Sequence, residues 1–398
     1  MPEQRESSTS AGEPITLLAV GDISPNRDDP PSIFRFCGDV FRKADIAFGQ
    51  MEAPLSDRGT PLFNIATGPA RLYAKNISAV TEEGAGFDVM SFAANHALDH
   101  GYEAFFDTIE ALTKHGILVV GAGKDITEAS RPAILERKGT KVGFLAYCSV
   151  LPMGYDAKDN RPGVNLLKAD TYYKQLVFTP GAPPLVVTQL VPEYRATMEE
   201  AIEKLRPQVD VLVVYIHAGV DGTGGVSTMI AMYQKEAAHA AIDAGADLVL
   251  QSHAHKLKGI EVYKGKVVFY GNSDFAVEHR LGYPGQPGDD AGLDRKRREQ
   301  AKEVNLDPDD ALYRRMHRGL THADHPKTVI VKVYIQNKKV QQVTCTPAWI
   351  SPNEEPEVLK RQDPRAQEVF DYMKRISEEE DLKVRFSWEG EEVLVGAP

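Results

Sequence analysis

Three features of the sequence predict an α/β fold. From residue 15 to about residue 257, short apolar runs alternate with longer amphipathic segments, as in parallel β-α units. From about residue 258 the pattern changes to pairs of strands joined by short turns. Hydrophobic residues make up 42% of the 398 residues, enough for one large core or two smaller ones. The predicted sheet therefore has parallel strands first and an antiparallel extension after them.

The parallel part is expected to contain buried strands and two clear helices. The strands are ITLLAVGD (15–22), ADIAF (44–48), DVMSF (88–92), ILVV (117–120), KVGFLAY (141–147), VDVLVVYI (209–216) and ADLVL (246–250). One helix spans 102–115, with apolar residues at helical spacing, and ends before Gly116. The other spans 231–244 and ends before Gly245, a residue typical of helix C-termini.

The antiparallel part is expected to consist of two hairpins. In the first, GIEVY and KVVFY are joined across Lys264-Gly265. In the second, strands 328–335 and 339–345 are joined across residues 336–338.

Domain boundaries follow from changes in composition. Residues 1–13 are polar and are expected to form a flexible tail, and 14–350 to form a single domain. Two stretches break the strand-helix rhythm, and we interpret them as insertions at 152–195 and 280–327, either rims over a site or plain surface. Residues 351–398 form an extension with a helix (365–380) and a short strand pair around Glu389-Gly390.

Composition excludes several classes of protein. The net charge of −11 argues against a general binder of nucleic acid or anionic membranes, which needs clustered positive charge. The three cysteines, Cys37, Cys148 and Cys345, have no C-x-x-C spacing, so neither a disulfide framework nor a thiolate zinc site is indicated. No apolar run is long enough to span a bilayer, and we expect no membrane anchor and a cytoplasmic location.

Residue types that bind metal ions recur at the carboxyl ends of the predicted strands, where open α/β sheets place their ligand sites. They are Asp22, Glu52, Asn95 with His96, His217, and His253 with His255. Each has an ordinary structural explanation by itself, such as a turn, a cap or a hydrogen-bonded core histidine. Together they favour a site for one or two divalent ions, and the lack of thiolates favours Mn, Zn or Fe.

Metal-assisted hydrolysis is the chemistry that this set of residues predicts. Glu52 is our candidate for a carboxylate that bridges two ions, and His96 for the proton donor to a leaving group. Asp99 either orients the His96 imidazole or caps the helix that follows, and both roles stay open. Arg27 is placed to hold an anionic group of the substrate.

The order of these motifs resembles the calcineurin-like metallophosphoesterases, and more closely the CapA (PGA_cap) family of bacterial capsule and poly-γ-glutamate biosynthesis. The resemblance covers roughly residues 15–276. It rests on Asp22 with Arg27, Gln50-Met51-Glu52, Asn95-His96 with Asp99, His217 with Gly219, His253 with His255, and Gly271-Asn272 with Phe275.

This resemblance implies a layered αββα sandwich of two mixed sheets carrying irregular insertions. It also implies six metal ligands, namely Asp22, Glu52, Asn95, His217, His253 and His255. His253 would join His217 and Asn95 on one ion, and His255 would join Asp22 on the other. Asn272 and Arg27 would contact substrate.

The sequence departs from the family pattern at three positions. Ser24 stands where a histidine ligand is expected, which leaves coordination of the second ion thin. Gln50 replaces an asparagine and Ala218 a tryptophan, at positions expected to face the substrate. These two changes indicate an altered specificity.

Three functions are compatible with these features. The first is a soluble metal-dependent hydrolase acting on a phosphoester or on an amide, γ-glutamyl or peptide-like bond. The second is a non-catalytic accessory role in capsule or poly-γ-glutamate biosynthesis. The third is a metal-free α/β binding protein. The partner is expected to be a small-molecule or polymer substrate, with an anionic one as an option, and not a nucleic acid; the oligomeric state is left open.

The second insertion carries three histidines, His317, His322 and His325. Histidines in a charged loop are usually solvated. The alternative is that they reach the metal site as part of a lid.

Overall fold

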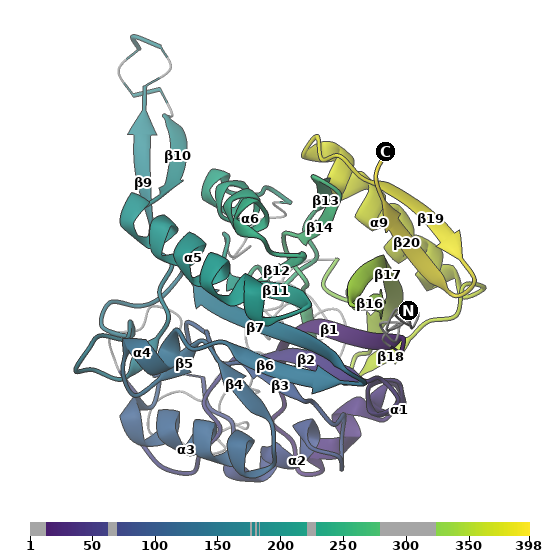
Figure 1. The fold of residues 1–398 in the computed structure, drawn as a ribbon, viewed down its shortest axis with the longest axis horizontal. Coiled ribbons are helices and arrows are strands. Elements are labelled where there is room, and N and C mark those ends of the chain that lie inside the picture. Colours follow the sequence, from purple (N-terminus) through teal and green to yellow (C-terminus); the bar gives the residue numbers. More distant parts are fainter. Residues whose placement is uncertain are drawn as a thin grey trace, which may run out of the picture.

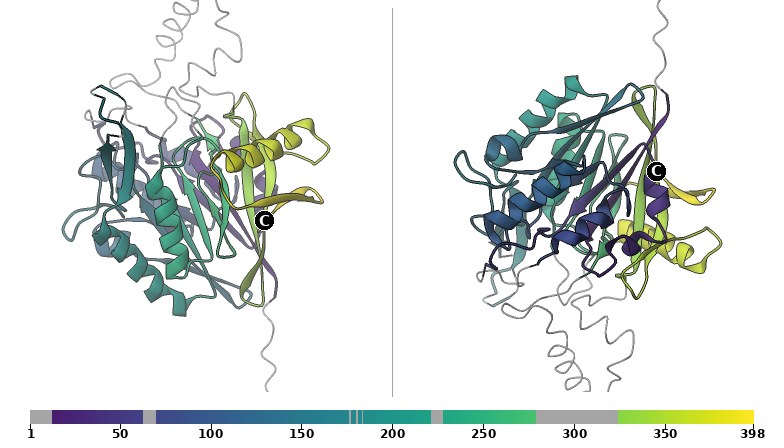
Figure 2. Two further views of the ribbon diagram at one scale, coloured as in Figure 1. Left: turned by 90° about the horizontal axis from the view of Figure 1, so that it is seen from above. Right: turned by 90° about the horizontal axis from the view of Figure 1, so that it is seen from below.

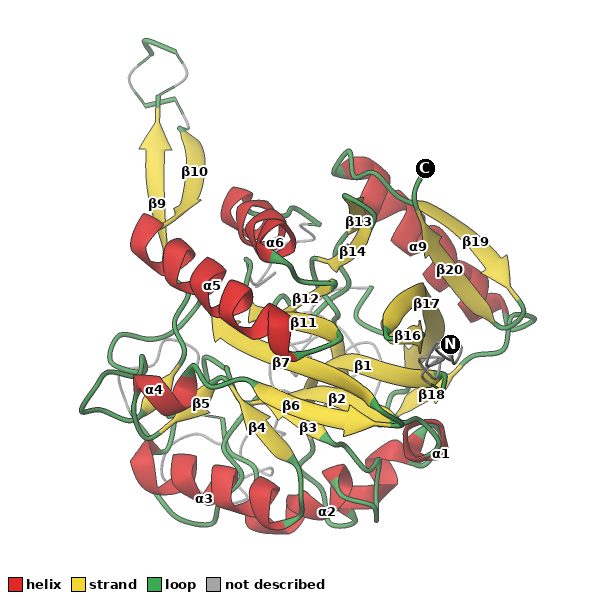
Figure 3. Cartoon of the chain, in the orientation of Figure 1, coloured by secondary structure: helices red, strands yellow, loops and turns green. Residues whose placement is uncertain are grey.

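Two large β-sheets pack face to face, and helices cover their outer surfaces (Figure 1). The computed structural model describes residues 13–62, 70–175, 177–179, 181–182, 184–220, 228–278 and 324–398. Figure 3 shows how strands and helices alternate along the first two thirds of the chain, as the sequence predicts. The layered α/β sandwich is therefore confirmed.

The first sheet has the strand order β19-β20-β17-β16-β1-β2-β3-β4, with β15 beside β1 and β18 beside β17. Its strands are β1 (Ile15–Ser24), β2 (Ile46–Met51), β3 (Val89–Ser91), β4 (Leu118–Val120), β15 (Asp274–Val277), β16 (Lys327–Gln336), β17 (Lys339–Ile350), β18 (Pro356–Val358), β19 (Arg385–Glu389) and β20 (Glu392–Gly396). Strands β1 to β4 run parallel, and β16 joins β1 antiparallel. The predicted antiparallel extension is therefore present.

The second sheet has the order β13-β14-β12-β11-β7-β6. Its strands are β6 (Ala133–Arg137), β7 (Thr140–Cys148), β11 (Val211–His217), β12 (Leu248–Ser252), β13 (Ile260–Tyr263) and β14 (Lys266–Phe269). Strands β7, β11, β12 and β14 are parallel, and β13 forms the predicted hairpin with β14.

Strand β11 shows how the layers arise from the sequence. Successive side chains of a strand point to opposite faces of the sheet. Val211, Val213 and Tyr215 belong to the core between the two sheets. Leu212, Val214 and Ile216 belong to a second core under the helices. The continuous apolar run VLVVYI is therefore explained by a strand that is buried on both faces.

The core between the sheets is held by aromatic contacts. The rings of Phe48 on β2 and Phe144 on β7 stack with centroids 5.4 Å apart, and Tyr215 lies 5.5 Å from Phe48. Stacked pairs of this kind add about 0.5–1.5 kcal/mol to the burial of their surface.

Helices form the outer layers, as the two turned views show (Figure 2). The longer ones are α3 (Gly101–Lys114), α5 (Pro192–Leu205), α6 (Met232–Ala244) and α9 (Pro364–Glu379), and the shorter ones are α1 (Gly38–Arg42), α2 (Ile77–Val80) and α4 (Ile126–Ala129), with 3-10 turns at η1 (Pro30–Phe34), η2 (Ala74–Asn76) and η3 (Arg206–Gln208). Helices α5 and α6 pack on the outer face of the second sheet, and α2 and α3 lie along the first (Figure 1). The helices predicted at 102–115, 231–244 and 365–380 correspond to α3, α6 and α9.

The first insertion, 152–195, contains more regular structure than its composition predicts. Short strands β8 (Gly163–Val164) and β5 (Ala122–Gly123) pair beside the domain. Strands β9 (Ala169–Lys174) and β10 (Leu185–Leu190) form a hairpin that projects from the body (Figure 1). Most of the second insertion and the tail up to residue 12 lie outside the described residues.

The C-terminal extension is continuous with the first sheet. Strand β20 pairs antiparallel with β17, where Thr344 is opposite Leu394, and β19 completes the predicted strand pair. The division into one domain plus an extension stays a prediction. Within the described residues no helix is long and apolar enough to cross a membrane.

Candidate metal centre

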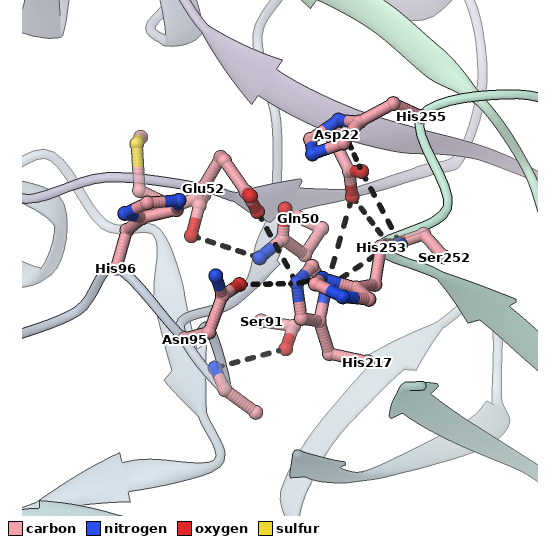
Figure 4. Close-up of polar contacts among 12 residues, drawn as sticks. Asp22, Gln50, Glu52, Ser91, Asn95, His96, His217, Ser252, His253 and His255 are labelled. Carbon is pink, nitrogen blue, oxygen red and sulfur yellow. Dashed lines mark hydrogen bonds and ion pairs between the residues drawn. The ribbon is translucent and has the colours of Figure 1, made fainter. Parts of the chain in front are cut away.

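The carboxyl ends of the parallel strands from both sheets meet at one edge of the sandwich, and the predicted site residues gather there (Figure 4). Asp22 lies near the end of β1, Glu52 directly follows β2, and His217 is the last residue of β11. His253 and His255 follow β12. Parallel strands bring their carboxyl ends to the same edge, which explains why distant motifs converge.

Ser252 joins the two sheets at this edge. Its hydroxyl donates a hydrogen bond to Asp22 Oδ1, and the backbone N–H of His253 donates to Asp22 Oδ2 over 3.4 Å. Asp22 on the first sheet is therefore held by the end of β12 on the second.

His217 Nε2 is the centre of a first group of donors. It lies 2.8 Å from Asn95 Oδ1, 3.2 Å from His253 Nδ1 and 3.5 Å from Glu52 Oε2. Nitrogen and oxygen donors around one transition-metal ion, each about 2.0–2.2 Å from it, are separated by comparable distances. All four predicted ligands of one ion are therefore brought together.

Glu52 provides a direct test of whether a cation fits. Its side chain is 2% exposed, and neither carboxylate oxygen makes a hydrogen bond with any described residue. A buried carboxylate normally has hydrogen-bond partners, because leaving it without them is costly. The donor set and this carboxylate fit a divalent ion, which Glu52, Asn95, His217 and His253 would hold.

A second group lies on the other side of Asp22. His255 Nδ1 is 3.8 Å from Asp22 Oδ2, as the resemblance implies. Ligand atoms of Asp22 also lie within 4.8 Å of those of Glu52 and His217. Asp22 thus takes part in both groups, whereas the bridging role predicted for Glu52 stays a prediction.

Burial controls protonation in this cluster. Burial raises the pKa of Asp22 to about 7, and the nearby charge of Asp274 adds to the shift. Burial also raises the pKa of Glu52 well above its usual value, with Asp22 contributing. Burial lowers the pKa of His253 to about 3 and that of His217 well below its usual range. The two histidines are therefore neutral, the form that binds metal.

His255 behaves differently from its neighbours. Burial by itself lowers its pKa, but the charge of Asp274 and its hydrogen bond, followed by Glu52 and Asp22, outweigh burial and leave the pKa well above the usual value. The nearby carboxylates thus favour the protonated imidazole, which must lose its Nδ1 proton before that nitrogen can bind a metal ion.

The backbone of the His-x-His segment is strained. The φ angles of His253 and His255 are +95° and +55°, in a region that L-residues seldom adopt. Such conformations are concentrated at functional sites, where surrounding contacts hold them. The segment is thus a turn that closes β12 and also aims both imidazoles into the cluster (Figure 4).

His96 and Asp99 lie beside the cluster in the turn before α3. His96 Nδ1 is 2.5 Å from Asp99 Oδ2, so the contact needed for orientation of the imidazole is present. Asp99 also accepts hydrogen bonds from the backbone of Ala70 at 2.7 Å and from Tyr155 Oη at 3.1 Å. Helix α3 has His100 as its N-cap with no side-chain cap bond, so the alternative capping role of Asp99 is not observed. The catalytic roles themselves stay predictions.

The two residues predicted to contact substrate, Arg27 and Asn272, have different surroundings in the structure. The Arg27 guanidinium is paired with Glu278 at 3.1 Å and with Glu355 at 3.0 Å, and donates to the carbonyl of Asn353. Arg27 thus ties the C-terminal extension to Glu278, the residue after β15, and its substrate role stays a prediction. The Asn272 side chain is fully buried and makes no hydrogen bond with described residues; its substrate role also stays a prediction.

Two residues of this region, Asp274 and Tyr155, were not among the predicted site residues. Asp274 starts β15 and its Oδ1 lies 2.7 Å from His255 Nδ1. Tyr155 comes from the first insertion, where spacing carries no signal. For Asp274 a signal exists, since the polar segment GNSDF follows a buried strand, but its pairing with β1 was not evident.

Of the three insertion histidines, the structure describes only His325. His325 is buried, with Nδ1 3.6 Å from Asp274 Oδ2 and Nε2 3.6 Å from Glu354 Oε2, so it is not a solvated loop residue. His317 and His322 lie outside the described residues.

The departures from the family pattern are all buried. Ser24 is 5% exposed, and Gln50 and Ala218 are fully buried. The expectation that Gln50 and Ala218 face a substrate stays a prediction.

Comparison with known proteins gives one family match and several relatives. The family model described as "Bacterial capsule synthesis protein PGA_cap" matches residues 16–279. The chain is 27% identical over 285 residues to the PGA biosynthesis protein CapA of Bacillus subtilis, covering 69% of this chain and 67% of that protein. It is 25% identical over 274 residues to the capsule biosynthesis protein CapA of Bacillus anthracis, covering 67% and 60%.

A probable polyglutamine synthesis accessory protein of Mycobacterium tuberculosis is 31% identical over 213 residues, covering 52% of this chain and 50% of that protein. The chain thus spans between half and two thirds of the length of these relatives. Among solved structures, a hypothetical protein from Thermus thermophilus has a TM-score of 0.42 and 13% identity, covering 84% of this chain and 98% of that one.

Proposed function

Because the chain belongs to the bacterial capsule synthesis family PGA_cap, we propose that it is a metal-dependent hydrolase acting on a phosphoester or γ-glutamyl amide bond in the metabolism of an anionic polymer. One observation carries the proposal. Four donors, from Glu52, Asn95, His217 and His253, converge on one point next to the His96–Asp99 pair.

Metal ions bound at this edge would lower the pKa of a water molecule and polarise the bond under attack. The protein residues would supply the proton for the leaving group and hold its donor in position. His96 Nδ1 faces Asp99, so Nε2 is the nitrogen left to hold a proton for the leaving group. Asp99 is itself fixed by Tyr155 and by the backbone of Ala70, which keeps the imidazole in one orientation. The strand ends hold the remaining donors without reorganisation.

The side chain of His96 is 15% exposed, whereas Asp99 and His217 are fully buried. A proton donor must reach the substrate, and an orienting carboxylate works best in a dry environment. This difference in exposure supports the division of roles between His96 and Asp99.

The test uses the full chain, stripped with EDTA and then reloaded with Mn²⁺ or Zn²⁺. We expect no cleavage of bis(4-nitrophenyl) phosphate or poly-γ-glutamate by the stripped protein, and cleavage of one of them after reloading. The matched variant His96→Asn should bind the same number of ions and cleave the substrate roughly 10²–10⁴-fold more slowly. A wild-type protein that binds no metal would contradict the proposal.

An accessory role is the second candidate, because the names of the relatives describe biosynthesis of polyglutamate and capsule. A metal-loaded protein that binds poly-γ-glutamate in equilibrium dialysis, yet leaves it and the phosphodiester intact, would favour this role. A metal-free binding protein, the third function compatible with the sequence, would show no ion in elemental analysis.

A further inference from the structure

Asp22 and Asp274 face each other on neighbouring strands. Strand β15 runs parallel to β1, and in this pairing Asp22 is the register partner of Asp274. Both side chains are fully buried. Two carboxylates at opposed positions of adjacent strands repel each other, and burial strengthens the repulsion. The pairing of β15 with β1 therefore places two buried carboxylates where a bound cation would relieve their repulsion.

His255 contributes a nitrogen atom beside the two carboxylates. Its Nδ1 lies 2.7 Å from Asp274 Oδ1 and 3.8 Å from Asp22 Oδ2. One ligand atom from each of the three residues lies within 4.8 Å of the other two. Two carboxylate oxygens and one imidazole nitrogen on a common centre are a ligand set found for divalent transition metals.

The nearby charge supports the same conclusion. Glu52 is also buried, and a ligand atom of its carboxylate lies within 4.8 Å of ligand atoms of Asp22 and His217. Among the side chains of Asp22, Glu52, Asp274 and His255 there are three acidic groups and one basic group. A divalent ion would offset two of the three negative charges and would be bound by the neutral form of His255.

We propose that Asp274 is a direct ligand of the second ion, together with Asp22 and His255. The proposal rests on the proposed function, in which metal is bound at this edge. It adds a protein ligand to the ion for which the sequence predicts Asp22, His255 and the bridging carboxylate of Glu52. That ion would have a carboxylate-rich shell, whereas the first would be held by two histidines, one amide and one carboxylate.

This difference in ligands has a consequence for metal choice. Carboxylate oxygens favour hard ions such as Mn²⁺, and imidazoles are well suited to Zn²⁺. The two positions would therefore differ in preference, with Mn²⁺ favoured beside Asp274 and Zn²⁺ beside His217 and His253.

The first experiment counts bound ions by titration calorimetry and elemental analysis. We expect two ions per chain in the wild type and one in Asp274→Asn. His217→Ala should lose the other ion, beside Glu52. Wild type without any ion would overturn the proposed function as a whole. Two ions bound with unchanged affinity in Asp274→Asn would overturn only the assignment of Asp274.

The second experiment separates direct ligation from a role in which Asp274 only orients His255. Asp274→Cys is loaded with Co²⁺ and examined for thiolate-to-cobalt charge-transfer absorption in the near ultraviolet. We expect this band in Asp274→Cys and not in the wild type, because Cys37, Cys148 and Cys345 belong to neither group of ligand atoms among the described residues. The control Ser273→Cys places a thiol at the adjacent residue and should show no band.

A folded Asp274→Cys protein that binds cobalt without the band would overturn direct ligation. Circular dichroism establishes that each variant is folded. If Asp274→Cys does not fold, the ion count of Asp274→Asn decides, since that change keeps the size of the side chain.

Discussion

His96 Nδ1 lies 2.5 Å from the carboxylate of Asp99, which is itself fully buried. A histidine held in this way keeps one tautomer and one orientation, and its other nitrogen is available for proton transfer. The partly exposed His96 is thus held by a buried carboxylate, which is itself held by Tyr155. We test the two contacts separately.

Replacing His96 by Asn should lower kcat for the cleaved substrate by roughly 10²–10⁴-fold, the usual contribution of a positioned acid or base. The ion count should not change, because His96 is not in either donor group. Steady-state kinetics and elemental analysis on the same preparation measure both. A variant that keeps most of the wild-type rate would show that another group supplies the proton.

Replacing Tyr155 by Phe should lower kcat by up to about tenfold, since it removes one hydrogen bond to Asp99 worth about 0.5–1.5 kcal/mol. Tyr155 touches Asp99 and acts through it, so KM should be unchanged. The double variant with His96→Asn should be no slower than His96→Asn alone. An additive loss would mean that Tyr155 contributes independently of the imidazole.

Metal binding should stabilise the fold. Mn²⁺ at 100 times its Kd should add about 2.7 kcal/mol to the free energy of unfolding, visible as a higher Tm that EDTA reverses. His217→Ala removes a donor at the centre of the first group and should reduce the shift. His115→Ala, at an exposed residue at the end of α3, is the control and should keep it. Equal shifts in both variants would contradict the assignment of the site.

The C-terminal extension should be held in a pH-dependent way by Glu392 on β20. Its carboxylate accepts hydrogen bonds from Lys332 at 2.8 Å and from Tyr334 at 2.9 Å on β16, and from Thr344 at 2.5 Å on β17. Burial opposes ionisation, but these hydrogen bonds outweigh it and lower the pKa of Glu392 below its ordinary value of 4.5.

A carboxyl whose pKa is lowered by folding stabilises the protein above its ordinary pKa, and this stability is lost as the pH falls through the lowered value. Glu392→Gln should therefore cost about 1–3 kcal/mol at pH 7 and much less below the lowered pKa. Urea unfolding of the wild type and Glu392→Gln, at pH 7 and at a pH below the lowered pKa, measures the free energy difference at each pH. A penalty that is the same at both values would mean that the charge of Glu392 has no part in stability.

The sequence by itself predicted most strands of the two sheets, helices α3, α6 and α9, and the six candidate ligands that the structure brings to one edge. Apolar runs such as VLVVYI are buried on both faces, and helices α3 and α6 end before Gly116 and Gly245, as their local chemistry requires. These features depend on the spacing of apolar residues and on local backbone preferences. Residues that are neighbours in sequence define both. The convergence of the strand-end residues also followed, because parallel strands share an edge.

Only the tertiary structure decided which residues complete the site. Asp274 faces Asp22 because β15 pairs with β1 across more than 200 positions of sequence, and Tyr155 reaches Asp99 from an insertion with no readable period. Arg27 contacts Glu278 and Glu355 for the same reason. Contacts between distant segments depend on how whole sheets pack, and a carboxylate at a strand start is not distinguished in sequence from one on the surface.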